Sequence, residues 1–157
     1  MFKLSQRSFQ RLAGVDAALQ ETVKLAIQKT KIDFGVICGM RTKEEQEVLV
    51  KKGASKTYKS KHLEGKAVDL MAYIDGGRAS WELNLYDEIA DAMKEASKET
   101  EVDLRWGAAW HINSMREQDM TSEAMMTQYI DLRRSQGRRP FIDCLLYTSD
   151  AADEFMG

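Results

Sequence analysis

The stretch between positions 60 and 70 constrains this chain most, because it places a carboxylate inside an apolar run. His62 precedes Asp69 by seven residues, and Gly65 lies between them. A buried carboxylate needs a cation or a hydrogen-bonding partner, and an imidazole with a carboxylate makes up two of the three protein ligands of a catalytic zinc ion. Residues seven apart on a regular strand point to opposite faces. We therefore expect Gly65 to turn the backbone so that His62 and Asp69 converge.

Capping residues and apolar periodicity indicate an α+β fold, with a small antiparallel sheet flanked by helices. Serine, aspartate and threonine caps, the last within a capping-box pattern, begin the first three helices. We expect helices over residues 5–12, 16–30, 42–52, 80 or 81 to 100, and 122–134. Apolar runs predict strands over residues 33–39, 66–74 and 102–106. The polar residues 54–61 predict a surface loop that leads into the histidine motif.

The bulk properties describe an ordinary globular protein, and 157 residues suffice for one domain with a sizeable core. The net charge of -2 gives no electrostatic reason to bind nucleic acid or a membrane. No apolar run approaches the roughly 20 residues of a membrane span. The first residues lack the apolar stretch of a secretory signal. We therefore expect synthesis in the cytoplasm.

The two cysteines, Cys38 and Cys144, are too few for a disulfide framework and do not form a CxxC motif. Cys38 ends an apolar run, which predicts a buried and inert core residue. A nucleophilic thiol at this position is the alternative that the sequence favours less.

Four segments of the chain together carry a resemblance to a family of enzymes. They are Gly39-Met40-Arg41-Thr42 with Gln46, Ser60-x-His62-x-x-Gly65-x-Ala67-x-Asp69, Leu104-Arg105-Trp106-Gly107, and the run from Tyr129 to Arg134 continued by Arg139 to Asp143. On these residues the chain resembles the M15 family of zinc peptidases, in particular the phage endolysin-type L-alanyl-D-glutamate peptidases related to D-Ala-D-Ala carboxypeptidases. The resemblance covers residues 1–143 and implies a Hedgehog/DD-peptidase-like fold.

The resemblance also implies a role for each matching residue. His62 and Asp69 are then two ligands of Zn²⁺, Asp143 is the general base, and Arg41 offsets charge on the scissile carbonyl oxygen. The metal lowers the pKa of its bound water towards roughly 7. Ser60 and Gln46 are then substrate-binding residues, with Ser60 alternatively supporting the loop that carries His62.

The third zinc ligand of the family is a histidine three residues after the base, and this chain has Leu146 there. The other histidine, His111, is the obvious substitute. It lacks the Asp-x-x-His pattern, which favours a surface or groove-lining residue over a ligand.

The sequence from Cys144 to Gly157 resembles the in-frame translation of a transposon adapter end used in preparing sequencing libraries. Our hypothesis is that the natural coding sequence stops after Asp143. Residues 1–143 are then a peptidase domain that lacks its last segment, and residues 144–157 are a non-native tail.

These observations favour a zinc-dependent hydrolase of the peptidoglycan stem peptide, an endopeptidase or a carboxypeptidase, used by a bacteriophage for cell-wall lysis. The alternative is an inactive wall-peptide-binding module on the same fold, because the third ligand is missing. A DNA-binding role for the arginines at 133, 134, 138 and 139 is less favoured, since cations suit a helix C-terminus. We expect a monomer without a nucleic-acid partner, which acts on the periplasmic wall after release with a holin-like partner.

Overall fold

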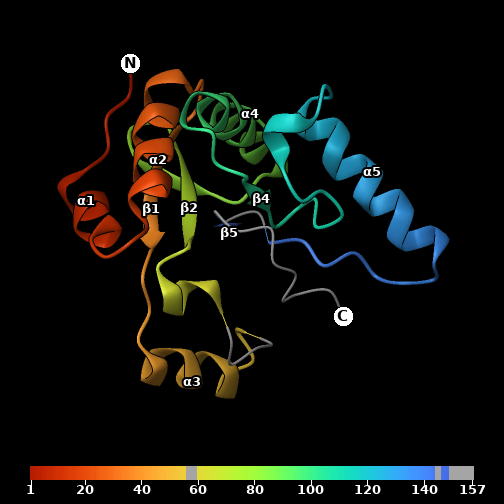
Figure 1. The fold of residues 1–157 in the computed structure, drawn as a ribbon, viewed down its shortest axis with the longest axis horizontal. Coiled ribbons are helices and arrows are strands. Elements are labelled where there is room, and N and C mark those ends of the chain that lie inside the picture. Colours follow the sequence, from red (N-terminus) through yellow and green to blue (C-terminus); the bar gives the residue numbers. More distant parts are fainter. Residues whose placement is uncertain (56–59, 144–145, 149–157) are drawn as a thin grey trace.

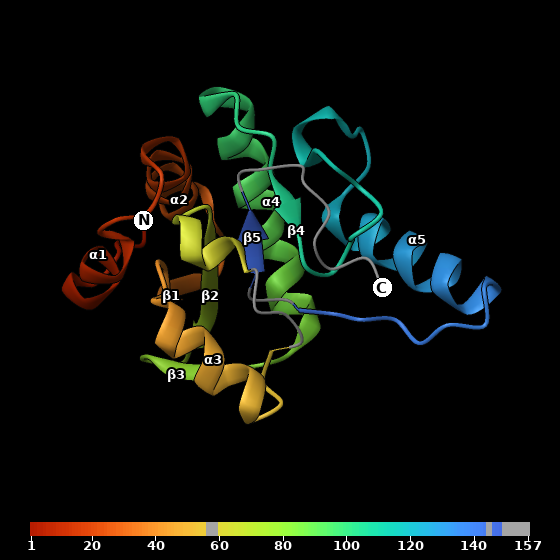
Figure 2. The ribbon, with the colours of Figure 1, turned by 60° about the horizontal axis from the view of Figure 1, so that its bottom comes forward.

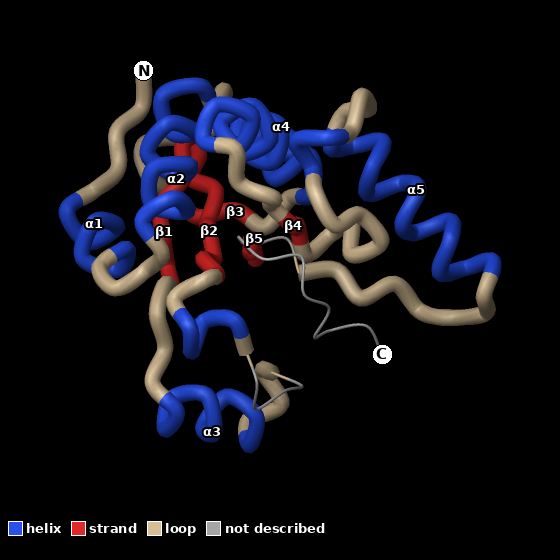
Figure 3. Tube along the Cα trace, viewed as in Figure 1, coloured by secondary structure: helices blue, strands red, loops and turns tan. Residues whose placement is uncertain are grey.

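The computed structural model describes residues 1–55, 60–143 and, for the backbone, 146–148. Figures 1 and 3 show helices gathered around a small sheet, which confirms the expected α+β fold. The helices are α1 (Gln6–Leu12), α2 (Ala17–Lys29), α3 (Lys43–Lys51), α4 (Leu83–Thr100) and α5 (Ser122–Ser135), with short 3-10 turns η1 (Lys61–Glu64) and η2 (Met115–Glu117). The strands are β1 (Asp33–Cys38), β2 (Ala67–Ile74), β3 (Arg78–Ser80), β4 (Arg105–Trp106) and β5 (Leu146–Thr148).

The first three helices begin at the capping residues that the sequence predicts. The side chain of Ser5 accepts a hydrogen bond from a backbone N–H of α1, and Asp16 does the same for α2. Thr42 and Glu45 form a complete capping box at the start of α3. Each cap satisfies a backbone donor that a helix leaves without a partner in its first turn.

The sheet is antiparallel throughout, and β2 is its central strand. β1 pairs with one edge of β2, while β3 and β5 pair with different parts of the other edge. β5 also pairs with β4, so the order across the sheet is β1-β2-β5-β4. Figure 2 shows β5 between β2 and β4. The last described strand therefore joins the two halves of the sheet.

The main core lies between the sheet and the pair of helices α2 and α4, which cover one face (Figure 1). Val68, Leu70 and Ala72 of β2 are fully buried in this core. Since side chains alternate along a strand, Asp69 points to the opposite face. Ala67 shares that opposite face, where it packs in a smaller cluster with Trp110 and Tyr129.

Several local expectations need correction. Helix α4 begins at Leu83 because the residues before it form β3, a short strand that closes a hairpin with β2. The strand expected over residues 102–106 is only Arg105–Trp106. Lys61 is buried in η1 rather than part of a surface loop, while residues 56–59 of that loop lie outside the described residues. Along the described ranges, no helix is both long enough and apolar enough to cross a bilayer.

Candidate metal centre and catalytic cleft

His62 and Asp69 converge because the chain changes direction between them, as Gly65 predicts. Ser60 caps η1 by accepting a hydrogen bond from the backbone N–H of His62 at 3.2 Å. Gly65 then ends the turn in the left-handed conformation, with φ of 69°. A Cβ at this position would lie 2.5 Å from the carbonyl oxygen of Gly14, so the site requires glycine for space as well as for conformation.

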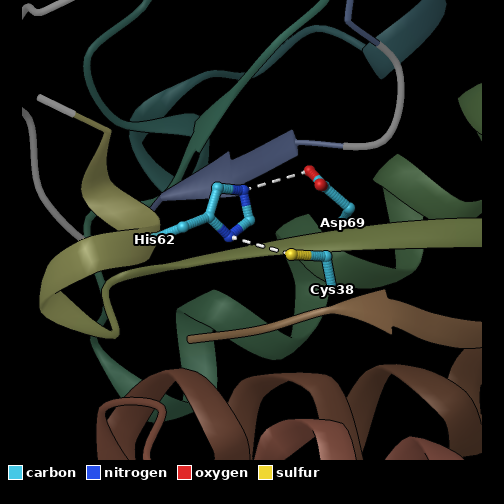
Figure 4. A group of neighbouring side chains, drawn as sticks. All are labelled: Cys38, His62 and Asp69. Carbon is cyan, nitrogen blue, oxygen red and sulfur yellow. Dashed lines mark hydrogen bonds and ion pairs between the residues drawn. The ribbon is translucent and has the colours of Figure 1, made fainter. Parts of the chain in front are cut away.

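The imidazole of His62 is 2 % exposed and is held at both nitrogens. Nδ1 lies 2.7 Å from the carbonyl oxygen of Gly39, and Nε2 lies 3.3 Å from Oδ1 of Asp69 (Figure 4). Burial lowers the pKa of His62, but hydrogen bonds to Asp69 and Cys38 and the charge of Asp69 outweigh it and raise the pKa to about 10. Without a metal ion, the imidazolium is therefore the favoured form at neutral pH.

Arg41 connects the carboxylate to helix α3. Its Nη2 lies 3.2 Å from Oδ2 of Asp69, and its Nη1 donates to Oε1 of Gln46 at 2.7 Å. Gln46 in turn donates to Oγ of Ser55 at 2.9 Å. The sequence selected Arg41 and Gln46 as site residues, and the structure brings both to Asp69 in one hydrogen-bonded chain.

Cys38 belongs to the same group and is only half-buried, so its expected burial in the core is wrong. A β-bulge at Ile37 shifts the register of β1, so that Cys38 and not Ile37 is opposite Asp69. The thiol is half-buried, with Sγ 3.8 Å from Nδ1 of His62 and 3.3 Å from Nε of Arg41. Burial raises the pKa of the Cys38 thiol, but its hydrogen bond to His62 and the charges of His62 and Arg41 lower it overall.

These side chains line one cavity of about 430 Å³. Asp143 lies in its wall, where its backbone N–H donates to the carbonyl oxygen of Gly107 at 2.8 Å. A Cβ at position 107 would overlap the carbonyl group of Asp143, which explains the glycine of the Trp-Gly motif. The hydroxyl of Tyr129 donates to the carbonyl oxygen of Phe141 and accepts from its backbone N–H. These two bonds fix the backbone just before Asp143. The cavity is lined by Arg41, Leu49, Ala54, Ser55, Ser60, His62, Asp69, Phe141, Ile142 and Asp143.

Comparisons with known proteins identify the family of this chain. The sequence profile of the family described as phage L-alanyl-D-glutamate peptidase matches residues 1–133. The chain belongs to this family. The L-alanyl-D-glutamate peptidase of Escherichia phage T5 is 32 % identical over 114 residues, which are 70 % of this chain and 82 % of the relative. The L-Ala D-Glu endopeptidase ChiX of Serratia marcescens has a similar structure, with a TM-score of 0.65 and 35 % identity over 69 % of this chain and 81 % of that protein.

The second histidine of this peptidase lies apart from the first. His111 is half-exposed, with Nε2 2.6 Å from Oε1 of Gln128 and its ring stacked on Tyr129 at 5.8 Å between centroids. It neither lines the cavity nor belongs to the group of Cys38, His62 and Asp69. The expectation of a surface or groove-lining residue agrees with this position.

The donor set of the peptidase suits a zinc ion. Cys38, His62 and Asp69 each have a ligand atom within 4.8 Å of the other two, the one such group among the described residues. Imidazole nitrogen, carboxylate oxygen and thiolate sulfur are the ligands that zinc takes in proteins. The contact of His62 Nδ1 with a backbone carbonyl is the usual outer support of a metal-binding histidine, and leaves Nε2 available.

Position 146 is adjacent to this group through the register of the sheet. Leu146 of β5 is the direct partner of Asp69 of β2. Directly opposed residues on neighbouring strands have their Cβ atoms on the same face, about 4.5–5.5 Å apart. A histidine at position 146 would therefore extend from the same face as Asp69.

Proposed function

We propose that this chain is a zinc-dependent endopeptidase of peptidoglycan that cleaves the L-alanyl–D-glutamate bond of the stem peptide in phage-mediated cell-wall lysis. The observation that carries the proposal is the facing pair His62 Nε2 and Asp69 Oδ1, 3.3 Å apart in the wall of a cavity that Asp143 and Arg41 also line. The family and the names of its relatives support the choice of the L-alanyl–D-glutamate bond. The resemblance to zinc peptidases supports the metal.

His62 and Asp69 would hold the metal ion, and a bound zinc ion supplies an acidified water and polarises a carbonyl group. Asp143 would accept the proton of the attacking water and return it to the leaving amine. Arg41 would offset negative charge on the carbonyl oxygen once the metal ion replaces its contact with Asp69. Ser60 keeps His62 in place through the cap of η1, and Gln46 keeps Arg41 at the cavity.

The test uses purified peptidoglycan with the metal-free protein, to which Zn²⁺ is added back. The proposal predicts new L-alanine carboxyl and D-glutamate amino termini by mass spectrometry, only with zinc present. Since position 146 holds leucine, we expect slow hydrolysis by this chain and faster hydrolysis by Leu146→His. Absence of cleavage by both proteins, with zinc bound, contradicts the proposal.

The second candidate is a wall-peptide-binding module without catalysis on the same fold. The observation that favours it is the leucine at the position that pairs with Asp69. It predicts that the chain binds peptidoglycan with or without zinc and that Leu146→His binds it equally well. Release of new termini by the unchanged chain excludes this alternative.

We further propose that the enzyme is made in the cytoplasm and reaches the periplasmic wall as a monomer with the help of a holin-like partner. Expression in a host with and without a co-expressed holin tests this, since lysis should require both proteins. The non-native origin of residues 144–157 stays a prediction. Re-amplification of the gene from its source tests it, because a native reading frame through Leu146 would contradict it.

A further inference from the structure

Asp69 has a sheet partner on each side. Cys38 of β1 pairs with it on one side, and position 146 of β5 pairs with it on the other. Directly opposed residues share one face of a sheet. Cys38 therefore lies on one side of Asp69, and position 146, where the family's third ligand is expected, lies on the other side.

The surroundings of Cys38 suit a ligand better than a packing residue. Figure 4 shows the Asp69 carboxylate beside one ring nitrogen of His62, Nε2, and the Cys38 thiol beside the other, Nδ1. The ligand atoms of all three lie within 4.8 Å of one another. Bonds of about 2.0–2.3 Å to a tetrahedral zinc ion put ligand atoms roughly 3.3–3.7 Å apart. In the metal-free protein Sγ lies 3.8 Å from Nδ1 of His62, so the group has to contract by about 1 Å and a rotation of the Cys38 side chain has to bring Sγ to the side of Nε2.

We propose that Cys38 supplies the third protein ligand of the metal ion in this chain, giving a Cys-His-Asp site. The inference rests on the proposed zinc dependence of the same site. On binding, the thiol and the His62 imidazolium each release a proton to solvent, and the metal forms bonds to Sγ, to Nε2 and to a carboxylate oxygen. The metal then replaces the contacts that Arg41 makes with Asp69 and Cys38 in the metal-free protein.

A thiolate ligand gives the site two properties that nitrogen and oxygen ligands alone do not give. Soft sulfur favours Zn²⁺ and Cd²⁺ over Mg²⁺ and Mn²⁺. A cadmium–thiolate bond also adds a charge-transfer absorption band in the ultraviolet. This band reports the Cys38 bond directly and does not depend on catalysis.

The experiment titrates metal-free protein with Cd²⁺ and records ultraviolet absorption, bound metal by equilibrium dialysis, and released protons. It is done on the Cys144→Ser background, so that Cys38 is the one remaining thiol. The test variant adds Cys38→Ser, which keeps a small polar side chain at the bulge. Far-ultraviolet circular dichroism and the thermal midpoint establish that both proteins fold.

We expect one bound Cd²⁺ with the charge-transfer band in Cys144→Ser. In Cys38→Ser the band should be lost, with affinity reduced by more than about 100-fold, since loss of an outer-shell partner alone costs about 10–100-fold. Cadmium that binds to Cys144→Ser without the band refutes ligation by Cys38 and leaves the proposed function intact. If Leu146→His, in the Cys38→Ser protein, binds zinc and cleaves peptidoglycan, the proposed function stands whichever way the cadmium result falls. No metal binding by any folded variant contradicts both.

Discussion

Replacement of Leu146 by histidine tests whether the register of β5 determines the metal site. Leu146 pairs directly with Asp69, so the new imidazole would extend from the same face of the sheet as the carboxylate. His62 Nε2 already lies 3.3 Å from that carboxylate. The substitution therefore adds a nitrogen donor beside the existing ligands.

The expected gain in zinc affinity follows from the free energy that one ligand contributes to zinc binding. Structural sites with four ligands bind zinc with about 10–16 kcal/mol, which is roughly 2.5–4 kcal/mol per ligand. One added ligand should therefore tighten the dissociation constant by about 100-fold or more. At a zinc concentration 100 times the new dissociation constant, the folded state gains about 2.7 kcal/mol. For a domain of this size, that raises the melting temperature by about 5–10 °C.

The assay measures zinc affinity by competition with a chelating dye, and thermal unfolding with and without zinc. Tyr147→His is the matched control, because position 147 pairs with Val68, which faces the opposite side of β2. Zinc affinity should rise in Leu146→His and stay unchanged in Tyr147→His. Equal affinities for both folded variants would refute the placement of position 146 beside the metal site.

Four further substitutions test other residues, and the first three follow from contacts described above and are made in the Leu146→His protein. Asp143→Asn should lower the rate of stem-peptide hydrolysis by about 10²–10⁴-fold with zinc affinity retained, and a smaller effect would exclude Asp143 as the general base. Gly107→Ala should lower the free energy of unfolding by about 1–3 kcal/mol and the hydrolysis rate, because the new Cβ displaces the backbone of Asp143; wild-type kinetics would contradict the close approach. Cys38→Ser should raise the hydrolysis rate further, since a thiolate that competes with water for the fourth position lowers the fraction of enzyme that holds the catalytic water; an unchanged rate would contradict this competition. Lastly, burial raises the pKa of Asp87 from 3.8 to about 6, with smaller contributions from the charges of Glu123, Asp91 and Glu88. The stability that protonated Asp87 gives is therefore complete below pH 3.8 and is lost as the pH rises through 6. Asp87→Asn should raise the free energy of unfolding by about 1 kcal/mol at pH 7.5 and not at pH 3.5, as measured by urea denaturation, and an equal change at both pH values would count against this ionisation.

The elements that the sequence predicted well are those with local signals. Ser5, Asp16 and Thr42 are caps whose side chains bond backbone groups only three residues away, so the pattern is complete within one turn. The convergence of His62 and Asp69 also followed from a local signal, because Gly65 permits the left-handed conformation that few other residues adopt.

The features that the sequence did not reveal depend on pairing between distant strands. The bulge at Ile37 has no signal of its own in an apolar run, yet it decides that Cys38 and not Ile37 is opposite Asp69. Likewise, β3 and β4 are too short to give an alternating pattern. Their extent is set by their partners in the sheet, which a linear pattern does not encode.

The interior position of β5 determines when the sheet of this chain becomes complete during synthesis. β1 and β2 pair, and α2 and α4 cover them, from residues that leave the ribosome early. β4 obtains its partner only when residues 146–148 insert between it and β2. At about 5–20 residues per second, translation separates Asp69 from this strand by several seconds. The residues of β1, β2, α2 and α4 are therefore synthesised seconds before β4 can obtain its partner, and residues 146–148 complete the sheet last.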